Sequence, residues 1–207
     1  MKRTVSIFLT ILTLGVLAMP VCGAGPSAAG SGDGAGAEFM TFAEMVERYV
    51  RTAGVSSAEA LEAFPASAAR GSADAAVLSV ALDASAEAAV YKPRLEFYCA
   101  VSKDSGRTGI KEIYHVELNR VYPSRSTGFA ICRQFNGVYK VWFRDAGTIE
   151  YSINGDFYRD GAQTVTAPLG GGCKVGEDGA VMLSVAGSGE PVYFSPIYQH
   201  GTVTFFT

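Results

Sequence analysis

The chain has 207 residues and a formal net charge of −3, with 17 Lys and Arg against 20 Asp and Glu. Its basic residues are scattered among acidic ones. Binding to a phosphate backbone needs a clustered basic surface, so we do not expect a nucleic-acid partner. The length suits one domain with a hydrophobic core rather than two.

The N-terminus has the pattern of an export signal. Lys2 and Arg3 precede an apolar run from Val5 to Ala18, and Pro20 and the small residues Gly23 and Ala24 follow it. A membrane-spanning helix needs about 20 apolar residues, whereas the core of a secretory signal has roughly 7 to 15. We therefore predict that residues 1–24 are a signal peptide and that the protein is periplasmic or extracellular.

An alternative is a lipoprotein anchored to the membrane through Cys22. Val21 directly before the cysteine argues against it, because lipid attachment favours a small residue at that position. Residues 25–38 are predicted to be a flexible Gly/Ala/Ser linker, which suits a free or an anchored protein. No second long apolar run follows, so we predict no transmembrane span after removal of the signal.

Residues 39–90 are predicted to be a helical N-terminal segment. Thr41 and Glu44 have the spacing of a capping box, and an apolar residue recurs with helical period until Gly54. A second short helix starts at Ser56 or Ser57 and ends at Phe64 before Pro65. Residues 66–89 are rich in alanine, which favours helix, but Leu78, Val80 and Leu82 alternate as in a strand, so this piece stays open.

From residue 91 to 207 the pattern predicts an antiparallel β domain. Short runs of β-branched and aromatic residues alternate with polar ones between turn signals. We predict a mainly β (α+β) fold, an antiparallel sandwich or barrel of roughly eight to ten strands preceded by two or three short helices. The segment Ile110 to Tyr122 also fits a helix, but its β-branched content favours a strand, with Ile110, Tyr114, Val116 and Leu118 on one face.

Turns are predicted where Asn or Asp precedes Gly. Asn136 and Gly137 suit a type I′ hairpin, which would place Phe135 opposite Val138 and Cys132 opposite Val141. Further turns are expected at Asn154–Gly155, Asp160–Gly161 and Asp178–Gly179, and His200 is expected in a loop.

Three cysteines remain after signal removal, namely Cys99, Cys132 and Cys173. An oxidising compartment favours one disulfide bond. Leu95, Phe97, Cys99 and Val101 share a strand face, and Cys132 is also predicted to point to the core, so we predict a Cys99–Cys132 bond. Three free, packed thiols are the alternative.

No residue pattern has the spacing of a known catalytic or metal site. His115 and Glu117 would share a strand face and could form an acid–base pair, but exposed strands usually carry such charges. Cys173 follows three glycines in a predicted loop, yet no histidine is implicated as the base for its thiol. We predict no metal site and no cofactor, because the two histidines are far apart in the sequence.

The aromatic residues of the second half are the most suggestive feature. Adjacent aromatics on a strand point to opposite faces, so some are expected at the surface unless both faces are covered. Trp142, Tyr158 and Tyr198 are the predicted members of an aromatic binding patch for a carbohydrate or a protein.

The leading interpretation is an exported, non-enzymatic binding or interaction module. A secreted or periplasmic hydrolase using His115 and Glu117 is one alternative. An envelope assembly subunit is another, because the run from Thr202 to Thr207 alternates as an exposed edge strand would.

Overall fold

A computed structural model describes residues 36–64, 74–84, 91–104, 107–123, 130–167, 173–186 and 191–205. The predicted signal peptide, Cys22 and nearly all of the predicted linker lie outside these residues. The linker prediction ends at residue 38, but a strand already begins at Gly36.

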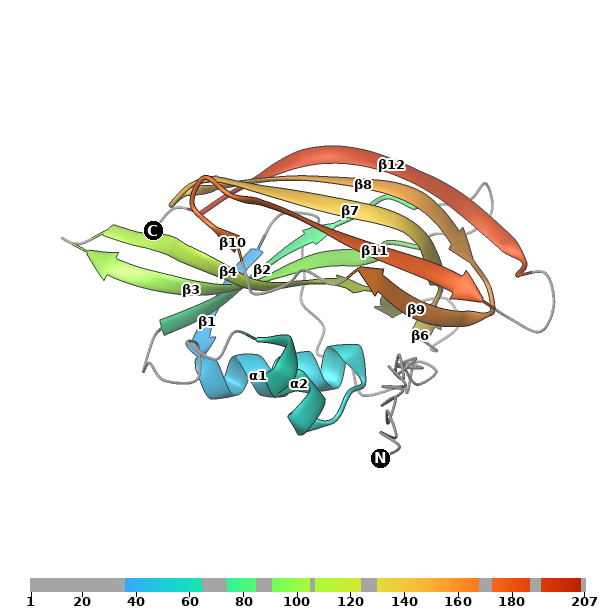
Figure 1. The fold of residues 1–207 in the computed structure, drawn as a ribbon, viewed down its shortest axis with the longest axis horizontal. Helices are drawn as coiled ribbons and strands as arrows, with labels where there is room; N and C mark the ends of the chain where they lie inside the picture. The colour runs from blue at the N-terminus through green and yellow to red at the C-terminus, as the bar shows by residue number, and fades with distance from the viewer. Residues whose placement is uncertain are drawn as a thin grey trace, which may run out of the picture.

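Two five-stranded antiparallel sheets form the body of the protein (Figure 1). The first sheet has the order β1, β2, β3, β4, β10, with bounds Gly36–Thr41, Asp74–Ala81, Arg94–Asp104, Arg107–Asn119 and Cys173–Lys174. The second has the order β12, β8, β7, β11, β9, with bounds Tyr193–Thr204, Thr148–Tyr158, Gln134–Asp145, Asp178–Ala186 and Ala162–Ala167. The short strands β5 (Val121–Pro123) and β6 (Ala130–Cys132) pair separately.

The main core lies between the two sheets. It joins the inward-facing side chains of β3, such as Leu95, Phe97 and Cys99, to those of β7 and β8, such as Phe143 and Ile149. The predicted strand face of β3 is therefore confirmed. Each sheet ends in unpaired edges among the described strands, so the fold is a sandwich and is not closed into a barrel.

The two helices cover the other face of the first sheet and form a third layer (Figure 1). Helix α1 (Phe42–Ala53) begins at Thr41 and ends at Gly54, and α2 (Ser57–Ala63) begins at Ser56; both carry a complete capping box. The sequence signals for both helices are thus confirmed. Met45 and Tyr49 of α1 pack with Tyr98 and other residues of the sheet in a second core.

Strand β2 resolves part of the segment that the sequence left open. It lies between β1 and β3 in the first sheet, and its alternate residues are buried on both faces because the second sheet covers one face and the helices cover the other. Ala76 and Leu78 face the second sheet, whereas Ala75 and Val77 face the helices. A strand covered on both faces loses the polar alternation that would identify it. The described residues of the predicted helical segment 39–90 thus include β2 and the end of β1 besides the two helices.

The hairpin predicted at Asn136–Gly137 is wrong. Both residues lie within β7, where Gly137 is opposite Gly155, and the predicted turn at Asn154–Gly155 likewise lies within β8. The chain reverses instead between Asp145 and Thr148. The glycines are required for packing: a Cβ on Gly137 would lie 2.8 Å from Cζ of Phe135, whose ring is fully buried.

Two further turn predictions have opposite outcomes. The Asp160–Gly161 turn is confirmed between β8 and β9, where Gly161 has a φ of 104°. The turn predicted at Asp178–Gly179 is wrong, because both residues begin β11. The reversal lies just before it, where Gly176 has a φ of 86° that favours glycine.

Strands β4, which ends at Asn119, and β5 confirm the strand interpretation of Ile110 to Tyr122, and β4 corrects its predicted faces. Cys99 is opposite Ile113 and Tyr98 is opposite His115, so Tyr114 is an extra residue in a bulge. Because of the bulge, Tyr114 faces the helices and Ile113 lies in the main core. Strict alternation had predicted the opposite faces for these two residues.

His200 lies in a strand rather than the predicted loop, because β12 runs without a break from Tyr193 to Thr204. Pro196 is tolerated there since β12 is an edge strand. Gly201 is explained by a close approach: a Cβ at this position would lie 2.6 Å from the hydroxyl oxygen of Tyr151.

The predicted Cys99–Cys132 bond is absent. Cys99 is a free thiol buried in the main core, and its strand β3 is flanked by β2 and β4. Cys132 lies in β6, which belongs to the separate two-stranded sheet. Sharing an inward orientation is insufficient for a disulfide bond, since the two Cα atoms must also come within about 7 Å.

Candidate functional site

The outer face of the second sheet is the face turned away from the first sheet. Its residues are the half-buried or exposed members of each strand, which alternate with core residues. The helices contact the first sheet, and no described element packs on this outer face. From β7, β8 and β12 it carries Asn136, Val138, Lys140, Trp142, Arg144, Thr148, Glu150, Ser152, Asn154, Asp156, Tyr158, Pro196, Tyr198, His200, Thr202 and Thr204.

All three residues of the predicted aromatic patch lie on this face, but they are spread along it. Trp142 is opposite Glu150, Tyr198 is opposite Asn154, and Tyr158 lies further along β8. Measured along β8, neighbouring aromatics are thus four residues apart, which is about 14 Å at about 3.4 Å per residue. The arrangement is an extended row rather than a compact patch.

Trp142 has an aromatic neighbour in His200, a residue that was expected in a loop. The ring of His200 lies 6.3 Å from that of Trp142, reaching from β12 across β8 to β7. The alternation of exposed Tyr198, His200 and Thr202 with buried Ile197 and Val203 is the signal that identifies this strand.

An ion pair borders Trp142. Arg144 donates to Glu150 at 2.7 Å, and this hydrogen bond lowers the pKa of Glu150, with a smaller contribution from His200. Both charged groups are therefore already partnered. Charges of both signs occur on the outer face, so it has no strong preference for an anion or a cation.

Tyr158 and Tyr198 differ in exposure. Tyr158 is half-buried and its ring lies 6.1 Å from that of Tyr193, which is itself exposed. Tyr198 is 81% exposed and stands out from the middle of the row. A large ring exposed to this degree on the edge strand β12 is available to a ligand.

His115 and Glu117 are together, but under the helix layer. His115 Nε2 lies 3.4 Å from Glu117 Oε2, and the two side chains are only 13% and 15% exposed. The ring of His115 packs against Tyr49 of α1, at 4.8 Å between centroids. The expectation that these charges lie on an exposed strand face is therefore wrong, because α1 and α2 cover this side of β4.

A second polar group lies beside this pair. Glu96 is 2% exposed and accepts hydrogen bonds from the hydroxyl of Tyr98, at 2.9 Å, and from the guanidinium of Arg48 on α1, at 3.2 Å. Arg48 also pairs with Glu38. Burial, followed by the charge of Glu96, raises the pKa of Tyr98, so its hydroxyl stays protonated as a donor. This cluster fixes α1 to the sheet.

The cysteine thiols are poorly placed for nucleophilic catalysis. Cys173 lies in β10 rather than in the predicted loop, and burial together with Glu177 raises its pKa to about 11. Burial also raises the pKa of Cys99. Both thiols are therefore protonated at neutral pH, the less reactive form.

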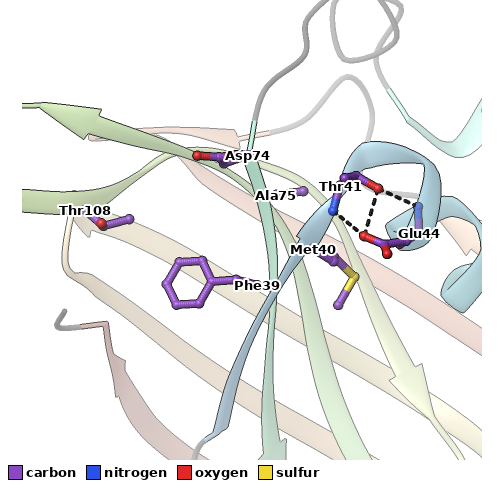
Figure 2. Close-up of a pocket in the computed structure, with 7 residues that line it drawn as sticks. All are labelled: Phe39, Met40, Thr41, Glu44, Asp74, Ala75 and Thr108. Carbon is purple, nitrogen blue, oxygen red and sulfur yellow. Dashed lines mark hydrogen bonds between the residues drawn. The ribbon is translucent and has the colours of Figure 1, made fainter.

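A hollow of about 500 Å³ lies between the start of α1 and the strands β1 and β2 (Figure 2). Its main polar groups are engaged with one another: Glu44 Oε2 accepts from the backbone N–H of Thr41, at 2.7 Å, and from its hydroxyl, at 2.8 Å. The hollow thus surrounds a helix cap. It does not present a set of convergent groups awaiting a ligand.

Within the described ranges, no three His, Cys, Asp or Glu side chains are arranged to hold a metal ion. No helix in that part of the chain is long and apolar enough to cross a membrane. Comparisons with protein-family models, with curated proteins and with solved structures found no match.

Proposed function

We propose that this chain is an exported, non-enzymatic binding module whose ligand lies along the outer face of the second sheet. The observation that carries the proposal is the row formed by Trp142, Tyr198 and Tyr158 on a face that no described helix covers. Packing explains the buried aromatics, whereas the ring of Tyr198, 81% exposed on the edge strand β12, is available to a ligand.

The spacing of the row favours an extended ligand. About 14 Å separates neighbouring rings along the strand direction, so one small molecule cannot contact all three. A polymer lying along β8 would pass Trp142 with His200, then Tyr198, then Tyr158 with Tyr193.

The side chains between the rings favour a glycan as that polymer. Ser152, Asn154 and Asn136 offer hydroxyl and amide groups that both donate and accept, as sugar hydroxyls do. Flat aromatic rings suit the apolar faces of sugar rings, and the partnered charges Arg144 and Glu150 do not demand an ionic ligand.

A glycan array probed with the purified protein tests this proposal. We expect binding to one or more oligosaccharides, and a loss of at least about tenfold in affinity for Trp142→Ala and for Tyr198→Ala, because each removes a stacking surface. Leu61→Ala is the matched control, since Leu61 is an exposed apolar residue of α2. Absence of binding to every glycan, or equal binding by all variants, would refute the glycan proposal.

A hydrolase using His115 and Glu117 is the alternative, supported by their 3.4 Å contact. It predicts that the bound oligosaccharide is cleaved and that Glu117→Gln stops cleavage without reducing binding. Their burial beneath Tyr49 favours a role in packing, so we expect the ligand to be recovered intact.

A further inference from the structure

The open edge of β12 distinguishes it from the other edge strands. It has 12 residues, against six each in β1 and β9 and two in β10. Its sequence contains no Lys, Arg, Asp or Glu. Edge strands are usually protected from association by being short or by carrying charges. The stretch of β12 from Ile197 to Thr204 has neither protection, because Pro196 and the irregularity in pairing between Tyr193 and Ser195 lie at the start of the strand.

One hydrogen bond establishes which backbone groups of β12 point to the open edge. The N–H of Phe205 donates to the carbonyl of Gly147 at 2.8 Å, and the register from Ser195 to Thr204 continues to this pair. In an antiparallel ladder, bonded and non-bonded pairs alternate. Val203, Gly201, Gln199 and Ile197 therefore bond to β8, whereas Thr204, Thr202, His200 and Tyr198 direct their N–H and C=O groups outward.

The position of Pro196 independently supports this assignment of inward and outward backbone groups. It belongs to the outward-pointing set, and a proline is tolerated in a strand where its missing N–H would have faced away from the ladder. The open edge thus offers four consecutive outward N–H groups and ends at a proline. No described strand pairs with them.

We propose that β12 pairs with β12 of a second copy of this chain, antiparallel, with His200 opposite the partner's Thr202 and Tyr198 opposite the partner's Thr204. In this register every outward residue meets another outward residue, and each such pair exchanges two backbone hydrogen bonds. Pro196 lies beyond the paired stretch. No Lys, Arg, Asp or Glu of either β12 enters the contact, because the strand has none.

Exposed apolar surface lies beside this edge, on the edge strand of the first sheet. Phe39 of the neighbouring edge strand β1 is 45% exposed and lies 5.5 Å from Phe205, ring to ring. Pairing would join the two second sheets into one continuous sheet with both outer faces on the same side. Two ligand rows would then lie side by side and could bind one polymer at two points.

Backbone pairing along one edge buries less area than a standard stable interface, so the dimer should dissociate on dilution. Sedimentation equilibrium of the full chain from about 1 μM to about 1 mM tests this, and the mean mass is expected to rise from that of one chain toward that of two. A single-chain mass throughout would refute the proposal.

Thr202→Pro removes one outward N–H without touching the ladder to β8, so we expect the dimer dissociation constant to rise at least about tenfold. Thr202→Val is the matched control, because it keeps the N–H and the branched shape, and it should dimerise as the original chain does. Equal dimerisation by the proline variant would contradict the proposed pairing.

Residue-resolved hydrogen exchange of the unsubstituted chain gives the answer even if Thr202→Pro fails to fold. The amides of Tyr198, His200, Thr202 and Thr204 should exchange more slowly at high protein concentration, whereas Gly201 and Val203 should be protected at any concentration. If the exchange rates of the four outward amides do not depend on protein concentration, the pairing is refuted. Trp142→Ala should leave dimerisation unchanged, so this inference and the ligand proposal fail separately.

Discussion

At the scale of single residues, the local signal and the packing compete, and packing prevails in the core. Asn136–Gly137 has the sequence of a hairpin turn, but the ring of Phe135 needs the space above two facing glycines. A turn signal depends only on the few residues of the turn. The space that the Phe135 ring occupies depends instead on Gly155 in β8, a strand that is distant in the sequence. No reading of residues 136 and 137 alone could have revealed it.

We predict that Gly137→Ala destabilises the protein by about 2 kcal/mol, because overpacking a tight core forces shifts of this cost. The new Cβ would lie 2.3 Å from the carbonyl oxygen of Asn154. Chemical denaturation measures the effect. Gly36→Ala, where no atom lies within 4 Å, is the control and should change stability by less than about 0.5 kcal/mol. Equal effects in the two variants would contradict the packing explanation.

The ion pair of Arg48 and Glu96 also acts at the residue scale. Arg48→Met would leave a carboxylate that is only 2% exposed without its cation. Because the Arg48 side chain is itself 22% exposed, we expect a loss of about 2–3 kcal/mol, below the cost of breaking a fully buried pair.

The double variant Arg48→Met with Glu96→Gln should recover at least about 1 kcal/mol of that loss in urea denaturation, since the uncompensated charge is gone. A double variant less stable than Arg48→Met would show that the two side chains are not coupled in this way.

At the scale of elements, the capped helices and the alternating strands could be predicted from the sequence. Their determinants are local: Thr41 with Glu44 starts α1, and the period of two along β3 identifies its core face. Strand β2 and the bulge at Tyr114 could not be predicted, because burial on two faces and an extra residue both depend on neighbouring elements. His115 was misplaced for the same reason, since the helices that cover it are remote in the chain.

The cap of α1 makes a prediction about pH. Hydrogen bonds from the backbone and side chain of Thr41 lower the pKa of Glu44 from its ordinary 4.5. A lowered folded-state pKa contributes stability that is present above the ordinary pKa and is lost as the pH falls through the lowered value. Thr41→Ala should therefore destabilise the protein more at pH 7 than in acid, as measured by urea denaturation at each pH. Glu44→Gln is the control, because it cannot titrate; a Thr41→Ala cost that is the same in acid would contradict the prediction.

At the scale of the whole molecule, the sandwich class followed from the number and alternation of the strands, but the layer order did not. The helices cover only the first sheet, so the outer face of the second sheet is left with its aromatic row. The sequence identified Trp142, Tyr158 and Tyr198 as candidates for exposure. Their common face, their spacing and the contact of Trp142 with His200 required the pairing of β7, β8 and β12.

Fluorescence of Trp142 tests the central claim most directly, because it is the only tryptophan in the chain and lies on the proposed binding face. Titration with an oligosaccharide that binds the protein is predicted to shift its emission and to protect it from a soluble quencher, with the same dissociation constant as binding itself. If the emission and the quenching of Trp142 stay the same when the protein is saturated with that oligosaccharide, the ligand lies elsewhere and the account is wrong.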